Sequence, residues 1–162
     1  MKEMDRQEAE RLVNSYSDLI LRLSYTYLKS VQDAEDICQT VFLKLLSVGK
    51  TFQSREHEKA WVVRTAINAC KDELSAYRRR MVPLEDVPEA AAPEPPQSDV
   101  LEAVMELPGK YREAIYLFYY EGYSVKEIGD LTGRSEAAVS AHLSRGRKKL
   151  RELLGGREYE PN

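Results

Sequence analysis

Apolar residues recur at intervals of three and four along most of this chain, which is the spacing of one face of an α-helix. The pattern covers residues 8–77, a stretch with no proline and with Gly49 as its one glycine. It returns over residues 100–154. Inside this second stretch it is interrupted at Pro108 with Gly109, at Gly122 and at Gly133. We therefore predict an all-α protein built from two helical blocks.

Residues 81–98 separate the two blocks and differ from them in composition. They contain four acidic residues, no Lys or Arg, and five prolines: Pro83, Pro88, Pro93, Pro95 and Pro96. Proline lacks an amide hydrogen and has a fixed φ, so the interiors of helices and strands exclude it. We predict a flexible, acidic, Pro-rich linker that joins two small helical domains, residues 1–80 and residues 99–157.

The second block contains the signals of a helix-turn-helix. Ser124, followed three residues later by Glu127, is a capping box, which predicts a helix that begins at Val125. Gly133 supplies the positive φ that a tight corner between two helices requires, and Ser135 caps the next helix. A short helix, a glycine turn and a longer helix form the motif that places its second helix in the major groove of DNA.

The second helix of this motif has an apolar and a polar face when it is drawn at about 100° per residue. The apolar face, which we expect to be buried, holds Val139, Leu143, Gly146, Leu150 and Leu153. The outward face and the helix entry comprise Arg134, Ser135, Ala137, Ser140, Ala141, Ser144, Arg145, Lys148 and Arg151. Small residues come first and cations later, as suits a helix that meets base edges and then phosphates. Upstream, we expect a packing face of Ile115, Phe118 and Tyr119.

The distribution of charged residues along the chain supports this interpretation. The net charge is −3, but residues 132–157 carry seven Lys and Arg against two Asp and Glu. Such a cluster is the electrostatic footprint of a nucleic-acid surface. The alternative is that these cations keep an amphipathic helix soluble and complement its dipole.

Residues 33–47 form another amphipathic pattern. Its apolar face comprises Ala34, Ile37, Cys38, Val41, Phe42 and Leu45, and its opposite face comprises Asp33, Asp36, Gln39, Thr40 and Leu43. A leucine exposed among acidic and amide groups has the composition of a protein-docking patch, an apolar anchor inside a polar rim. A solvated helix face that carries one leucine is the simpler alternative.

The helical pattern over residues 58–80 also has two distinct sides. The side expected to be buried holds Val63, Ala66, Ile67, Cys70, Leu74 and Tyr77, and the polar side holds Trp61, Arg64, Thr65, Asn68 and Lys71. A tryptophan beside arginine, lysine and asparagine can stack an unpaired base, hold its phosphate and read its edge. The alternative is that Trp61, near the helix start, packs on the preceding loop.

Several function classes are disfavoured by what the sequence lacks. No apolar run is long enough to cross a bilayer, and the charged start differs from a signal peptide, so we expect a cytoplasmic protein without membrane insertion. Cys38 and Cys70 lie far apart, and His57 and His142 are isolated, which argues against a disulfide or a metal site. No phosphate-binding loop and no constellation of acid, base and nucleophile is present, so neither an enzyme nor a cofactor is predicted.

Three segments, in order, carry a resemblance to a known family: YSDLILRLSYTYLKSVQDAEDICQTVFLKLL, then EKAWVVRTAINACKDEL, then LPGKYREAIYLFYYEGYSVKEIGDLTGRSEAAVSAHLSRGRKKLREL. Together they resemble a bacterial sigma factor of the sigma-70 family, in its extracytoplasmic-function group. The resemblance covers nearly the whole chain. It implies an alternative sigma factor, a non-catalytic subunit that binds core RNA polymerase and directs promoter recognition, DNA melting and transcription initiation.

The resemblance also implies a role for each surface. Core polymerase would dock on the face with Asp33, Asp36, Gln39, Thr40 and Leu43. The segment 50–58 and the face with Trp61 would melt and capture the minus-ten element of promoter DNA, and the helix-turn-helix would bind the minus-thirty-five element. An anti-sigma factor is implied as a regulatory partner. Two departures are Ser140, Ala141 and His142 where Lys-Ser-Arg is common, and Thr40 where glutamate is common.

Two functions of other classes stay open at this level. One is a stand-alone helix-turn-helix transcriptional repressor, whose N-terminal block would serve dimerisation or effector binding. The other is an adaptor that binds only protein through its basic helix. Trp61 with Arg64 and Asn68 argues against a repressor that binds duplex DNA alone, and the separate acidic and basic blocks argue against the adaptor.

Overall fold

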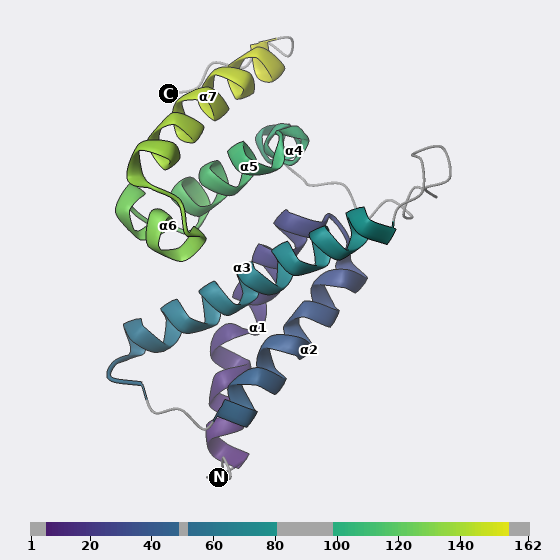
Figure 1. Ribbon diagram of the computed structural model, residues 1–162, viewed down its shortest axis with the longest axis vertical. Helices are drawn as coiled ribbons and strands as arrows, with labels where there is room; N and C mark the ends of the chain where they lie inside the picture. The colour runs from purple at the N-terminus through teal and green to yellow at the C-terminus, as the bar shows by residue number, and fades with distance from the viewer. Residues whose placement is uncertain (1–5, 49–51, 81–98, 156–162) are drawn as a thin grey trace. The chain divides into compact units, whose positions relative to one another are not determined.

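A computed structural model describes residues 6–48, 52–80 and 99–155 of the chain. Every regular element in these ranges is helical, which confirms the predicted all-α fold. The chain divides into two compact units (Figure 1), one with helices α1 to α3 and the other with helices α4 to α7. The predicted linker, residues 81–98, lies outside the described residues. None of the described helices is long and apolar enough to span a membrane.

The N-terminal unit is a bundle of three helices: α1 (Arg6–Leu28), α2 (Val31–Val48) and α3 (Arg55–Arg80). Each of them packs against the other two, so their apolar faces meet in one core. Fully buried core side chains include Ile20, Leu23, Val41, Val62 and Ile67. The burial of each such side chain stabilises the fold by about 1.5–3 kcal/mol.

The sequence pattern does not predict the break between α1 and α2, because the segment contains neither glycine nor proline. Lys29 adopts the left-handed conformation, with a φ of 58°, and its amide donates to the carbonyl of Tyr25 over 2.7 Å. Ser30 then caps α2, since its Oγ accepts from the amide of Asp33 over 3.1 Å. The packing of α1 against α2 offsets the backbone strain at Lys29.

The predicted buried faces of α2 and α3 differ from the structure at their edges. Cys38 and Phe42 on α2, and Leu74 on α3, are half-buried. Tyr77 is 45% exposed, so its assignment to the core was wrong, and Val62 is fully buried instead. The last residues of α3, from Tyr77 onward, are all exposed. The helix continues through these residues although their side chains are exposed.

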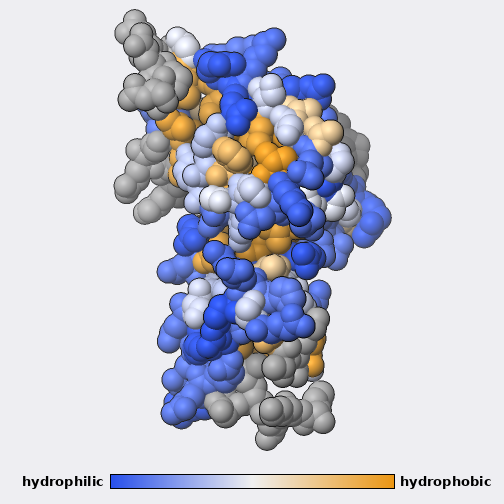
Figure 2. Space-filling model, turned by 90° about the vertical axis from the view of Figure 1, so that its left-hand side faces the viewer, coloured by the Kyte–Doolittle hydropathy of each residue, from blue (hydrophilic) through white to orange (hydrophobic). Residues whose placement is uncertain are grey.

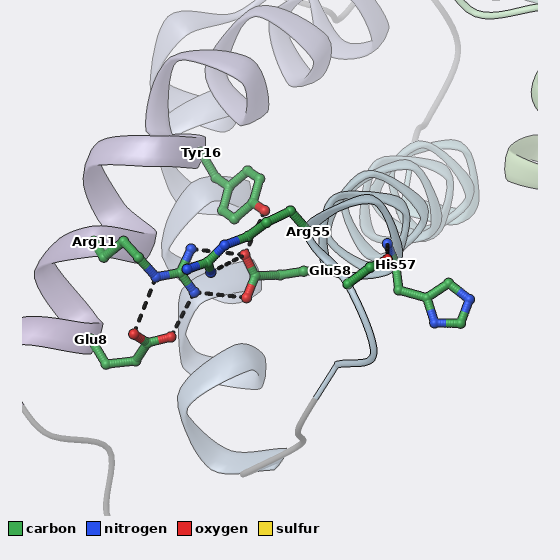
Figure 3. Close-up of polar contacts among 7 residues, drawn as sticks. Glu8, Arg11, Tyr16, Arg55, His57 and Glu58 are labelled. Carbon is green, nitrogen blue, oxygen red and sulfur yellow. Dashed lines mark hydrogen bonds and ion pairs between the residues drawn. The ribbon is translucent and has the colours of Figure 1, made fainter.

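A polar network joins α1 to the first turn of α3 (Figure 3). Arg11 donates two hydrogen bonds to Glu58, from Nη1 over 2.9 Å and from Nη2 over 2.7 Å. Tyr16 donates to the same buried carboxylate over 2.7 Å, and Arg11 also pairs with Glu8. Figure 3 shows Arg11 between the two carboxylates, while the side chain of His57 points away from them. The network therefore connects residues that lie far apart in the sequence.

The contacts in this network set the protonation of its members. Hydrogen bonds from Arg11 lower the pKa of Glu58 and outweigh the opposing effect of burial. The same contacts raise the pKa of Arg11. Burial, with the hydrogen bond to Glu58, raises the pKa of Tyr16 to about 12. At neutral pH the carboxylate is therefore ionised, the guanidinium is protonated and the phenol keeps the proton that it donates.

The C-terminal unit contains α4 (Asp99–Glu106), α5 (Gly109–Ile115), a π-helical segment (Tyr116–Tyr120), α6 (Val125–Thr132) and α7 (Glu136–Gly155). Helices α4, α5 and α6 all pack against α7, which is therefore the central helix of this unit. The approach of α7 to α5 is close, because a Cβ atom at Gly146 would lie 2.9 Å from Cγ1 of Ile115. Glycine allows this approach without displacing the isoleucine side chain.

In the aromatic segment before α6, the buried residues differ from those predicted. Ile115 is buried as expected, but Tyr119 is 54% exposed, and Tyr116 and Leu117 are buried in its place. The cause is the π-helical segment, at whose end the amide of Glu121 donates to the carbonyl of Tyr116 over 3.2 Å. A π-helical turn holds more residues than an α-helical turn. A helical wheel drawn at 100° per residue therefore assigns the residues after it to the wrong side.

The apolar face of α7 follows the prediction along its first half. Val139, Leu143 and Gly146 are buried as expected. Near the end of the helix Leu153 is 36% exposed, and Leu154 is buried instead. Three helices contact α7, so the side that is covered depends on which neighbour lies beside each turn. A single helical wheel assumes that the same side is buried along the whole helix, so it does not predict the switch from Leu153 to Leu154.

Candidate nucleic-acid interface

The predicted helix-turn-helix forms with its predicted caps. The amide of Glu127 donates to Oγ of Ser124 over 3.1 Å, and the amide of Ser124 donates to Oε1 of Glu127 over 2.9 Å, which completes the capping box. Gly133 has a φ of 75° at the corner, as predicted. Ser135 begins α7, since its Oγ accepts from the amide of Ala138 over 3.1 Å. These local interactions set where each of the two helices begins and ends.

Gly129 is a second glycine on which the turn depends. Its carbonyl accepts from the amides of Gly133 and Arg134, over 2.9 and 3.1 Å. A Cβ atom at Gly129 would lie 2.8 Å from the backbone oxygen of Arg134. A side chain at this position would therefore push the entry of α7 away from α6.

The outward face of α7 combines small and cationic residues, as the sequence indicates. The exposed members are Ala137, Ser140, Ser144, Arg145, Lys148 and Arg151, and Ala141 is half-buried beside them. Small residues occupy the first turns, where a backbone can approach closely, and the cations follow. The structure thus brings the predicted helix residues of the minus-thirty-five surface together on one face.

Arg134 forms an ion pair that no local sequence pattern predicts. Its Nε donates to Oε1 of the buried Glu113 over 2.9 Å, and a third of its side chain is exposed. The two residues are 21 positions apart, so no local pattern indicates the pair. The ion pair holds the guanidinium against α5 at the entry of α7.

His142 does not share the outward face. It is buried and lies edge-on to Tyr111, with ring centroids 5.8 Å apart. Its Nδ1 has no hydrogen-bond partner in the described parts of the chain. Burial, followed by the nearby charges of Arg134 and Lys110, lowers the pKa of this imidazole. His142 is therefore a neutral packing residue, whereas its neighbours Ser140 and Ser144 are exposed.

Exposed apolar side chains gather on α2. The face drawn in Figure 2 is mainly hydrophilic, with apolar side chains in small patches. Four large apolar residues of α2 are exposed, namely Val31, Leu43, Leu46 and Val48, and Leu43 is the most exposed at 67%. The predicted docking residues Asp33, Asp36 and Gln39, which precede Leu43 on the same helix, are also exposed. Thr40 is half-buried, and its Oγ1 donates to the carbonyl of Asp36 over 3.0 Å.

The predicted single-strand surface of α3 contains exposed and half-buried members. Arg64 and Asn68 are exposed, whereas Thr65, Lys71 and Trp61 are half-buried. The ring of Trp61 lies 5.9 Å from that of Phe52 in the preceding loop, so it packs on that loop and keeps part of its surface accessible. The segment 50–58 is a loop only in part, because α3 begins at Arg55, and residues 49–51 lie outside the described residues.

Neither cysteine is activated as a thiolate. Cys70 is fully buried, and burial raises the pKa of its thiol to about 12. Cys38 is half-buried, and burial together with the charge of Glu35 raises the pKa of its thiol. Both thiols therefore stay protonated at neutral pH.

Two family models match the chain. Sigma-70 region 2 matches residues 12–80, and Sigma-70 region 4 matches residues 97–150. RNA polymerase sigma factor CarQ of Myxococcus xanthus is 35% identical over 139 residues, which cover 78% of each chain. RNA polymerase sigma factor SigV of Bacillus subtilis is 31% identical over 137 residues, 82% of each chain. The ECF RNA polymerase sigma factor SigE of Mycolicibacterium smegmatis is 30% identical over 165 residues, 93% of this chain and 63% of that one.

Solved structures have the same fold. The sigma factor RpoE, in complex with the anti-sigma factor NepR from Bartonella quintana, is 22% identical and has a TM-score of 0.74 over 90% of this chain and 96% of that chain. CnrH, in complex with the cytosolic domain of CnrY, is 21% identical and has a TM-score of 0.66 over 94% and 90% of the two chains. The family models cover the two units in the order of the helices described above. The chain therefore belongs to the sigma-70 family of bacterial RNA polymerase sigma factors, in its extracytoplasmic-function group.

Proposed function

We propose that this sigma factor directs initiation by binding core RNA polymerase through α2, the minus-ten element through α3 and the minus-thirty-five element through α7. Residues 1–80 then serve polymerase and the minus-ten element, residues 81–98 act as a tether, and residues 99–157 serve the minus-thirty-five element. The observation that carries the proposal is that two compact units present exposed helix faces of different character. A repressor that bound only duplex DNA would need the α7 face alone.

The docking face of α2 has the composition of a protein interface. Leu43 supplies an exposed apolar anchor, and the exposed polar residues Asp33, Asp36 and Gln39 precede it along the helix. Thr40 completes this face, although its hydroxyl is already bonded to the helix backbone. The acidic rim suits a partner surface with basic groups, and its charges would orient the encounter with core polymerase.

The α3 face suits unpaired DNA. The accessible part of Trp61 offers a stacking surface for a base, and Arg64, Thr65, Asn68 and Lys71 offer donors for phosphates and base edges. A base that leaves the duplex is stabilised by such contacts, which offset the loss of stacking. Melting is thus driven by binding free energy, and the sigma factor itself carries out no chemistry.

The α7 face suits duplex DNA in the major groove. Arg134 and Ser135 stand at the helix entry, where the ion pair with Glu113 holds Arg134 in place. Ala137, Ser140, Ala141 and Ser144 permit close approach to base edges, and Arg145 and Lys148 reach phosphates. With His142 buried, base reading depends on the exposed small residues and on Arg134.

Polymerase docking and the tether make the two DNA contacts cooperative. Each unit alone has a small surface, so its affinity for promoter DNA is expected to be modest. When one unit is bound, the tether keeps the other at high effective concentration, which raises the overall affinity by about 10²–10⁴ without new contacts. The action on polymerase also places this protein in the cytoplasm.

We assign an anti-sigma factor as its regulatory partner. The relatives RpoE and CnrH were solved in complex with NepR and with the cytosolic domain of CnrY, respectively. In this chain, the exposed apolar residues on α2 form a surface that such a partner can cover. Covering the α2 face would block core polymerase.

Run-off transcription with purified chain and bacterial core polymerase on a pool of promoter fragments tests the proposal. Specific transcripts should require the chain. Asp36→Arg should reduce them at least about tenfold, because it reverses a charge at the docking face. Asn68→Ala should leave polymerase binding intact and reduce open-complex formation, measured with permanganate footprinting.

Two exposed residues of α1 provide matched controls. Asp18→Arg and Asn14→Ala make the same changes away from the three surfaces and should leave transcription unchanged. Equal losses in the controls would show that the effects are not specific to the surfaces. If polymerase gives no transcript while the chain alone shifts a duplex fragment, the repressor function replaces this proposal.

A further inference from the structure

The first turn of α3 is tied to α1 through one buried carboxylate. Glu58 is 6% exposed and accepts hydrogen bonds from Arg11 and Tyr16, over 2.7 to 2.9 Å. The guanidinium of Arg11 also donates to Glu8, from Nε over 3.1 Å and from Nη2 over 2.6 Å. Arg11 is therefore fixed between two carboxylates (Figure 3), and it fixes Glu58 in turn.

The same turn holds the loop that precedes α3. Ser54 caps the helix, since its Oγ accepts from the amide of His57 over 3.1 Å and its carbonyl accepts from the amide of Glu58 over 3.0 Å. Phe52 lies two residues before this cap, and its ring is 5.9 Å from that of Trp61. Trp61 follows Glu58 by three positions, so the two lie within one turn of the helix. The loop, the cap and the tryptophan are thus connected to α1 through Glu58.

An ionic network at this place sets a geometry that apolar packing would not. A buried ion pair is often no more stabilising than apolar side chains of similar size, because both ions lose their water. The contribution of the Arg11 fork is direction, since two hydrogen bonds set the orientation of the carboxylate as well as its distance. Apolar contacts are non-directional. Stability alone therefore does not explain a carboxylate one turn before Trp61.

We propose that Arg11 and Glu58 are positioning residues for the minus-ten element: they hold the first turn of α3 and the segment 52–54 so that the accessible part of the Trp61 ring is ready to stack on an unpaired base. Neither residue binds DNA itself, because Glu58 is buried and negatively charged and the guanidinium of Arg11 is occupied by two carboxylates. A surface that is ordered before binding avoids the entropic cost of ordering its side chains on the DNA. This inference rests on the proposed function of α3.

Glu58→Gln tests the inference, because it removes the charge and keeps the size of the side chain. Trp61 is the one tryptophan of the chain, so its quenching by acrylamide reports directly on this segment. Below the unfolding transition, the whole chain in its free form should show stronger quenching in the variant. Assembled with core RNA polymerase, the variant should bind a single-stranded minus-ten oligonucleotide with a Kd about tenfold higher, because Phe52 and Trp61 must then be ordered on binding.

Two control variants separate positioning from stability. Glu10→Gln makes the same change in the exposed pair of Glu10 with Arg6 and should alter neither the quenching nor the Kd. Val41→Ala lowers the stability of the same unit by leaving a cavity in its core. It should lower the unfolding temperature and leave both the quenching of Trp61 and the Kd for the single strand unchanged. Affinity for a minus-thirty-five duplex should be the same in all three variants.

Unchanged quenching or an unchanged Kd in Glu58→Gln would overturn the inference. Equal losses in Val41→Ala would overturn it too, because the effect would then be one of stability alone. Trp61→Ala separates the inference from the proposed function. If single-strand binding survives Trp61→Ala, the minus-ten assignment of α3 fails. If Trp61→Ala abolishes binding while Glu58→Gln leaves it intact, only the positioning role fails.

Discussion

Glu58 is a carboxylate that joins two helices from a buried position. It lies in the first turn of α3, is 6% exposed, and accepts hydrogen bonds from Arg11 and Tyr16 of α1. Ionised groups tolerate burial when such partners replace water. Loss of one partner leaves the other charge without compensation, which costs more than the intact pair contributes.

Arg11→Ala should lower the free energy of unfolding of the N-terminal unit by about 3 kcal/mol, because Glu58 then stays buried with only the 3.5 Å ion pair to the exposed Arg55. Urea unfolding followed by circular dichroism measures the change. Arg6→Ala is the matched control, since the pair of Arg6 with Glu10 on the same helix is largely exposed, and it should have little effect. Similar losses in both variants would contradict a specific role for the network.

The sequence predicts the contacts of some residues and not those of others. Ser124, Glu127 and Ser135 were predicted as caps and act as caps, because a cap bonds to an amide two or three residues away. The partners of Glu58 and Arg134 were not predicted, because they lie 47 and 21 positions away. Residues so far apart in the sequence come into contact only when the helices pack together.

At the scale of elements, the corner between α6 and α7 depends on two glycines for different reasons. Gly133 is required for its positive φ, which side-chain-bearing residues rarely adopt. Gly129 is required for space, since the backbone oxygen of Arg134 would lie only 2.8 Å from a Cβ atom at this position. The neighbour at Gly129 is backbone, so it cannot move aside as a side chain could.

Gly129→Ala should destabilise the C-terminal unit by about 1–3 kcal/mol, because the added methyl group overpacks the corner. Thermal unfolding measures this loss, and binding to a minus-thirty-five duplex should weaken as the entry of α7 shifts. Gly155→Ala is the control, because nothing lies within 4 Å of its Cβ position. A Gly129→Ala protein as stable as that control would show that the corner adapts without strain.

Elements whose signals are local were predicted well, and two features were not. The start of α6, the corner at Gly133 and the boundary at Pro108 all appear where the sequence indicates. The left-handed Lys29 and the π-helical segment after Ile115 were not predicted, because no residue type marks them. The left-handed residue and the π-helical segment both depend on how neighbouring helices pack. That packing also sets which side of each adjacent helix is buried.

At the scale of the molecule, each unit has its own buried core, so each should keep its structure without the other. A protease site inserted between residues 81 and 98 allows the tether to be cut after assembly of the whole chain. Both thermal transitions should persist after cleavage. Promoter affinity in the presence of core polymerase should fall about 10²-fold or more, because the second DNA contact is no longer intramolecular. Unchanged affinity would show that the tether is not needed for joint binding.

The sequence alone determined the helical class, the break at Pro108, the caps and corner of the helix-turn-helix, and the family. Helical periodicity, proline and glycine breaks and capping boxes all act over three to five residues, so they are written in the local order of the chain. The polar faces of α2, α3 and α7 were identified in the same way. In the structure Leu43, Asn68 and Arg145 are exposed on these faces, as predicted.

The tertiary structure decided which side chains are enclosed and which charges are paired. It buried His142, exposed Tyr77 and Tyr119, and joined Arg11 to Glu58 and Arg134 to Glu113. Burial and ion pairing depend on which helix lies beside a side chain, and that neighbour is set by packing between segments far apart in the sequence.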